Sequence, residues 1–350
     1  MHEHIARTLY YFQVHLLYAS MVGLAAWALS SIPVGSATAK YWMWVATSLN
    51  FILPVGAIFD KVGAAHLSWA TPLGTIGDAA GRVSRGPVSV VLSVVWLLGA
   101  ILMFTRLCLR IRADHRDAQA TTGKSALNPG LSLLAGRVPV RFAESRRGPA
   151  VDGVLHPHIS LPNGIERVLS EHELNAVLIH ELTHARRRDN LICLIHELGL
   201  CALWFHPLVW MTGSRLALYR ELSCDESVIQ RAHGRDLVSA LAKLANPELV
   251  NSEEAFLLQA TASSFLSHRL SRLSAHPQAT FRAASALLIV TFGAVLVGGV
   301  LGTVAHTACC FVARHVATVP ALPHPVSCKR QARLLAASDI QEHSGTDDGF

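Results

Sequence analysis

The sequence is poor in charge. Asp, Glu, Lys and Arg make up only 15% of its 350 residues, whereas 51% are hydrophobic. A soluble domain of this length normally has about a quarter charged residues. The apolar residues are also gathered in blocks. The composition therefore argues against an ordinary soluble globular protein and favours a membrane protein.

Two further absences narrow the function. No CxxC pair occurs among the seven cysteines, and those in apolar or helical segments are interpreted as small buried hydrophobic residues (Cys108, Cys193, Cys201 and Cys224). The net charge of +6 is not accompanied by a nucleic-acid-binding motif. We therefore expect the basic residues to meet an anionic lipid bilayer, and we expect no nucleic-acid partner.

Four apolar stretches are each near the roughly 20 residues that a membrane-spanning helix needs. Three lie within residues 1–109, at about 10–32, 41–59 and 88–109, and the fourth covers residues 283–311. The sequence thus predicts a mainly α-helical, multi-pass protein of the cell (inner) membrane with four spans.

Arginines give the predicted orientation, because basic residues accumulate on the cytoplasmic side of a membrane. They follow the third span and precede the fourth (Arg106, Arg110, Arg112, Arg116, Arg269, Arg272 and Arg282). The segment between these spans is therefore predicted to be cytoplasmic, and residues 312–350 to form a short external tail. One alternative stays open. Residues 26–28 (Ala-Trp-Ala) resemble a signal cleavage site, and removal of the first span would reverse the orientation.

Residues 180–184 read His-Glu-Leu-Thr-His, the HExxH pattern. Positions four apart lie on one face of an α-helix, so His180 and His184 can converge on a single zinc ion. Glu181 can then act as general base toward a water on that ion. The helix itself is indicated by a Ser-x-x-Glu capping box, Ser170 to Glu173, just before the apolar pattern. We therefore predict one Zn²⁺ per chain.

The string LIHEL occurs a second time, sixteen residues later, and contains His196 and Glu197. Position 200 is Leu, so His196 has no histidine partner one helical turn on. We interpret His196 and Glu197 as a polar spot on a mostly buried helix.

A catalytic zinc site normally has three protein ligands and keeps a fourth position for water. The strongest candidate for the third ligand is Glu221, on a helix predicted from Pro207 to a stop at Gly234. Asp225 shares a face with Glu221 and can hydrogen-bond the free nitrogen of a ligand histidine. Arg231 or His233, just after this helix, is a candidate donor to the oxyanion of the transition state.

Residues 191–212 are apolar and long enough to span, but His184 and Glu221 lie on either side of them. A single crossing would separate the two ligands by about 30 Å. We therefore expect this run to turn back, either as a re-entrant hairpin or as the buried core of a cytoplasmic domain.

Two shorter features flank the motif. Residues 138–142 and 154–161 predict short strands beside the HExxH helix. The edge of such a sheet would either bind an extended peptide or be merely structural. Residues 110–136 are predicted to be a linker.

The segments HELTHARRRDNL, WFHPLVW and ELSCDESV, with HPHISLP upstream, resemble the membrane zinc metallopeptidases of the BlaR/MecR type. These are antibiotic-sensing signal transducers and their relatives without a sensor. The resemblance implies a cytoplasmic, α+β, gluzincin-like zinc metallopeptidase domain over residues 137–282, between the third and fourth spans. It implies zinc ligands at His180, His184 and Glu221, a catalytic base at Glu181, and Asp225 behind the ligands.

The resemblance also implies a function. The expected activity is that of a zinc metalloendopeptidase that cuts a cytoplasmic or membrane-proximal protein in regulatory signalling, with a cytoplasmic regulator as a further partner. Ser-x-x-Lys occurs nowhere in the sequence, so we do not expect a β-lactam-acylated sensor. The alternatives are a non-enzymatic, zinc-stabilised signal transducer, or a membrane protease similar to the CAAX and HtpX types.

Overall fold

The computed structural model describes residues 2–53, 87–119, 135–143, 148–231, 233–244 and 283–298. In chain order its elements are α1 (His2–Ser31), α2 (Ala37–Ile52), α5 (Pro87–Gln119), β1 (Val140–Ala143), β2 (Ala150–Asp152), β3 (His158–Pro162), α7 (Ile165–Val168), α8 (Glu171–Arg187), α9 (Asp189–Ala202), α10 (Pro207–Ile229), α11 (Gly234–Leu244) and a last helix, Ala283–Gly298. The prediction of a mainly α-helical chain is confirmed. The predicted external tail lies outside the described residues.

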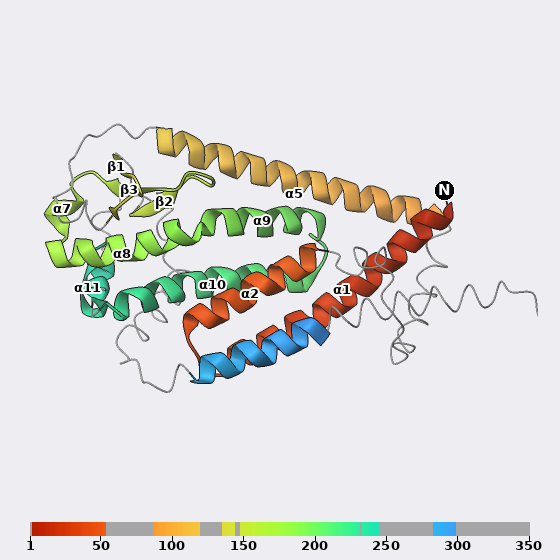
Figure 1. Cartoon of the computed structure of the whole chain (residues 1–350). Helices are drawn as coiled ribbons and strands as arrows, with labels where there is room; N and C mark the ends of the chain where they lie inside the picture. The colour runs from red at the N-terminus through yellow and green to blue at the C-terminus, as the bar shows by residue number, and fades with distance from the viewer. Residues whose placement is uncertain are drawn as a thin grey trace, which may run out of the picture.

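The longer helices form a bundle, and the sheet lies at one end of it (Figure 1). Helix α2 contacts α1, α9 and α10, while α5 contacts α9. Helix α8 packs against both α10 and α11 at the end where the sheet lies. The two HExxH-bearing turns of α8 therefore lie where the bundle meets the sheet.

One helix among the described residues is long and apolar enough to cross a membrane. It is Val90–Ala113 within α5, and only 6% of its most apolar window is buried in the described part of the chain. Helix α2 has 16 residues, and residues 54–59 of its predicted span lie outside the described part. Of the four predicted spans, the described residues thus give one clear candidate, the third. Helix α5 also continues to Gln119, ten residues into the predicted linker, because that stretch is rich in Arg and Ala, which favour helix.

The apolar run at residues 191–212 does not form one helix. Helix α9 ends at Ala202, and Pro207 occupies the first turn of α10, where its missing N–H costs nothing. Helix α10 then returns along α9 and reaches α8. It ends at Ile229, earlier than the predicted stop, and Gly234 instead begins α11.

The sheet has the order β1–β3–β2, with β1 parallel and β2 antiparallel to β3. The predicted strand at residues 154–161 begins only at His158, because the chain turns at Gly153 with φ +85°. Glycine adopts this left-handed conformation without strain. Strand β2 was not predicted, since three residues are too few to show an alternating pattern.

Two apolar cores meet along α10. Its Val228 belongs to a core formed with α8, α11 and the sheet. Its Leu216, Tyr219 and Leu222 belong to another, formed with α1, α2 and the last helix. Glu221 therefore lies on the part of α10 that joins the end with the sheet to the bundle.

Candidate metal site

Helix α8 begins with the predicted capping box, which is confirmed. The Glu173 amide donates to Ser170 Oγ, and the Ser170 amide donates to Glu173 Oε2 at 2.7 Å. These bonds satisfy two of the backbone donors that a helix start leaves free. The fixed start sets the rotation of α8, and its buried face carries His180 and Glu181.

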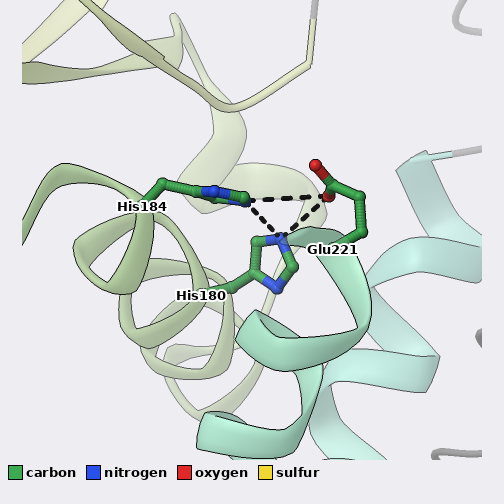
Figure 2. Close-up of side chains that lie close together, drawn as sticks. All are labelled: His180, His184 and Glu221. Carbon is green, nitrogen blue, oxygen red and sulfur yellow. Dashed lines mark hydrogen bonds and ion pairs between the residues drawn. The ribbon is translucent and has the colours of Figure 1, made fainter. Parts of the chain in front are cut away.

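His180, His184 and Glu221 point toward one another (Figure 2). The Nε2 atoms of the two histidines are 3.2 Å apart. Glu221 Oε2 lies 3.4 Å from Nε2 of His180 and 3.7 Å from Nε2 of His184. All three side chains are largely buried, at 7%, 11% and 17% exposure. Two imidazoles and a carboxylate are a ligand set that suits zinc, so the residues present fit the predicted ion.

The other oxygen of Glu221 is held from the opposite side. Arg220 lies 3.0 Å from Glu221 Oε1 through both Nε and Nη2. Both contacts converge on Oε1, which leaves Oε2 for the histidines. The neighbouring arginine is a partner that the helical spacing of the motif does not predict.

Asp225 lies behind His180, one turn after Glu221. Its Oδ1 is 3.1 Å from His180 Nδ1, although the angle is not that of a good hydrogen bond. A carboxylate on the far nitrogen of a ligand imidazole is the usual arrangement around zinc, because it holds the ring with Nε2 forward.

Asp189 takes the corresponding place behind His184, and sequence reasoning missed it. His184 Nδ1 and Asp189 Oδ2 are 2.7 Å apart, and Asp189 is 2% exposed. The chain turns sharply at Arg188, whose φ is +55°, so a residue five positions after His184 comes back to its ring. Helical spacing alone predicts partners at three or four positions. The sequence does contain one indication of this role, since Asp189 directly follows three arginines at the end of the HExxH helix.

The charges of this cluster shift the pKa of each member. Burial opposes protonation of His180, but Asp225 and Glu221 outweigh it and raise the pKa of His180 to about 9. Asp189, Cys224 and Glu221 likewise raise the pKa of His184 well above its ordinary value, against the effect of burial. Burial would raise the pKa of Glu221, but the two histidines hold it well below its usual range. A cation is thus strongly favoured at this point, either as protons on the imidazoles or as a metal ion in their place.

Glu181 is buried on α8, directly after His180. Arg231 and His233 lie beyond the end of α10 at Ile229, and the stretch of helix from Glu221 to Ile229 spans about 12 Å. His233 Nδ1 is 3.2 Å from Asp236 Oδ2 at the start of α11. The structure therefore brings His180, His184, Glu221 and Asp225 together. The two candidate oxyanion donors instead follow the end of α10.

The second LIHEL copy has other partners. His196 Nδ1 lies 2.9 Å from Ser48 Oγ on α2, and Glu197 pairs with Arg110 on α5 at 2.9 Å. Among the described residues, His196 belongs to neither group of side chains close enough to share a metal ion. The second of those groups consists of His184, Asp189 and Cys224.

A cavity of about 1500 Å³ opens beside the site, between α5, α9, α10 and the turn after β2. Arg220 lines it and so connects it to Glu221. Arg106, Arg110 and Arg141 add further basic groups to a wall that is otherwise mostly apolar. Of the four cysteines interpreted as buried, Cys201 and Cys224 are buried, while Cys108 and Cys193 are partly exposed.

Comparison with known proteins agrees with the geometry. A family model described as BlaR1 peptidase M56 matches residues 12–273. The chain is 26% identical over 230 residues to the regulatory protein BlaR1 of Bacillus licheniformis, covering 61% of this chain and 37% of that protein. It is 18% identical over 150 residues to the methicillin resistance mecR1 protein of Staphylococcus aureus and of Staphylococcus epidermidis, covering 41% of this chain and 26% of those proteins. The chain thus spans well under half the length of these relatives.

Proposed function

The chain belongs to the BlaR1 peptidase M56 family, and we propose that it is a membrane zinc metalloendopeptidase that acts in regulatory signalling. The observation that carries this proposal is the convergence of His180, His184 and Glu221, with Glu181 next to the first of them. A scaffold that merely needed zinc for stability would have no chemical use for a buried carboxylate at Glu181.

Each residue has a distinct role in the proposed reaction. His180, His184 and Glu221 would hold the ion, and Asp225 and Asp189 orient the two imidazoles from behind. Zinc, when bound, lowers the pKa of a water toward roughly 7 and polarises a peptide carbonyl. Glu181 accepts the proton of the water as it attacks, and it then delivers that proton to the departing amine.

The proposed substrate is a cytoplasmic or membrane-proximal protein. Support comes from α5, which has many exposed apolar side chains and carries arginines in the last turns of its apolar segment. Arg106, Arg110 and Arg112 are exposed there, where a cytoplasmic lipid surface would neutralise them. The active site then faces the cytoplasm. Two relatives named as a regulatory protein and a resistance protein favour a regulator as the substrate.

Replacing Glu181 by Gln tests the proposal, because the amide keeps the shape and removes the base. Zinc content should stay near one per chain, while cleavage of a peptide library should fall by at least about 100-fold. Glu197→Gln is a matched control in the second LIHEL copy. It breaks only a partly exposed ion pair with Arg110, so both zinc and cleavage should stay near the parent values. Undiminished cleavage by Glu181→Gln would show that Glu181 is not the base, and no cleavage by the zinc-loaded parent would favour the zinc-stabilised transducer.

A further inference from the structure

A buried tyrosine on α2 reaches the metal site through one carboxylate. Tyr41 Oη donates a hydrogen bond to Asp189 Oδ1 at 2.7 Å, and neither residue is more than 2% exposed. The other oxygen of Asp189 lies 2.7 Å from Nδ1 of His184. A continuous chain of two hydrogen bonds therefore runs from α2, in the predicted second membrane span, to a candidate metal ligand.

Arg187 strengthens the same connection. Its Nη2 donates to Asp189 Oδ2 at 2.6 Å, and its guanidinium lies 4.3 Å from the centre of the Tyr41 ring. Arg187 also donates to Ser223 Oγ, and to the Arg220 carbonyl at 3.3 Å, both on α10. Tyr41 thus contacts the carboxylate with its hydroxyl and the guanidinium with its ring face. A shift of α2 relative to α9 would alter both contacts at once.

Because Asp189 is buried, its position is sensitive to the loss of any one hydrogen bond. An unpaired oxygen on a buried carboxylate is costly, so Asp189 must either keep the Tyr41 bond or move to find another donor. Any such movement turns the His184 ring, because Asp189 holds its Nδ1. The direction of Nε2, which faces His180 and Glu221, depends on that ring.

We infer that Asp189 and Tyr41 are positioning residues of the metal site, and that the Tyr41–Asp189–His184 chain couples the position of α2 to metal affinity. This inference rests on the proposed zinc site but not on peptidase activity. It gives α2 a route by which a change in the membrane region reaches the ion without passing through the substrate.

Tyr41→Phe tests the coupling, because it keeps the ring over Arg187 and removes only the hydroxyl. Tyr219→Phe is the matched control. Tyr219 is also buried, and its hydroxyl donates to the Ser30 carbonyl at 2.9 Å, away from Asp189. Zinc affinity is measured by competition with a chelator on the full chain in detergent. The absorption spectrum of the cobalt-loaded protein reports ligand geometry, and the melting temperature of the metal-free protein reports folding.

Asp189→Asn should weaken zinc binding about 10- to 100-fold. Tyr41→Phe should weaken it between about 2- and 30-fold and shift the cobalt spectrum. Tyr219→Phe should change affinity by less than about 2-fold and leave the spectrum unchanged. In the Asp189→Asn background, Tyr41→Phe should have little further effect, since the two act through one chain.

Parent-like affinity and spectrum in Tyr41→Phe would overturn the inference, as would full additivity with Asp189→Asn. Equal losses in the Tyr41 and Tyr219 variants would also overturn it, because both would then act only through packing. If the coupling is found but neither parent nor variants cleave protein, the peptidase proposal fails and the coupling stands.

Discussion

The position of the His184 ring depends on residues from three separate parts of the chain. The HExxH spacing predicts its nearness to His180, because four positions make one helical turn. Glu221 was predicted as the third member from its residue type and its place on a second helix. Asp189 and Tyr41 could not be predicted in the same way. Asp189 reaches His184 because the chain turns at Arg188, which has a left-handed conformation. Tyr41 reaches Asp189 because α2 packs against a helix about 150 positions later.

At this scale the two LIHEL copies provide the clearest comparison. His180→Ala removes a metal-facing imidazole, so the purified protein should lose most of its zinc. His196→Ala removes an imidazole whose contact is Ser48, so zinc should stay near one per chain. Metal analysis of both variants checks this. Equal loss of zinc in the two would contradict the assignment of the first copy alone.

Helix α8 combines a start that local sequence predicts with a tertiary anchor that it does not. Its capping box follows from sequence. Its tertiary anchor does not, because Glu173 also accepts from Ser239 Oγ at 2.5 Å and from Lys243 Nζ at 2.7 Å on α11. These partners lie 66 and 70 positions away, beyond the reach of any local pattern. The sheet order escaped prediction for the same reason.

Glu173 gives α8 a defined response to acid. Lys243, then Ser239 and the Ser170 amide, lower the pKa of Glu173 to about 2, from an ordinary value of 4.5. Because the folded pKa is depressed, this stabilisation is complete above about pH 4.5 and is lost as pH falls toward 2. Glu173→Gln should lower the free energy of unfolding by about 1–2 kcal/mol at neutral pH and by much less near pH 2.

The measurement is the melting temperature of the metal-free protein against pH, which removes any contribution from zinc binding. Glu166→Gln, on the exposed side of α7, should follow the parent at every pH. A Glu173→Gln deficit that stayed constant from pH 7 to pH 2 would show that the ionised carboxylate is not the cause.

The described part of the chain joins a bundle of apolar helices to a smaller end with the sheet and the candidate metal site, and α10 belongs to both. Composition and arginine placement predict a membrane protein with four spans. Among the described residues, one helix is long and apolar enough to cross a membrane. Apolar residues that face lipid and apolar residues that face a core look alike in sequence. Val90–Ala113 is mostly exposed in the described part of the chain, whereas α2 buries Tyr41, Trp44 and Phe51 against the other helices.

Reporter fusions test the orientation of the whole chain. A reporter fused after Ala120 should read as cytoplasmic, because the arginines that follow α5 favour that side. One fused after Arg330 should read as external, on the far side of the predicted fourth span. An external signal at position 120 would reverse the predicted topology and move the active site out of the cytoplasm.

The ligand set of the ion is the central claim, and X-ray absorption spectroscopy of the zinc-loaded, full-length protein measures it most directly. With His180, His184 and Glu221 as ligands, the zinc shell should contain two imidazole nitrogens at about 2.0–2.1 Å and oxygen at about 2.0–2.2 Å, with no sulfur. Those imidazole features should be halved in His184→Ala, provided that variant still holds the ion. The other group of metal-capable side chains contains Cys224. A sulfur at about 2.3 Å would place the ion there and contradict the account.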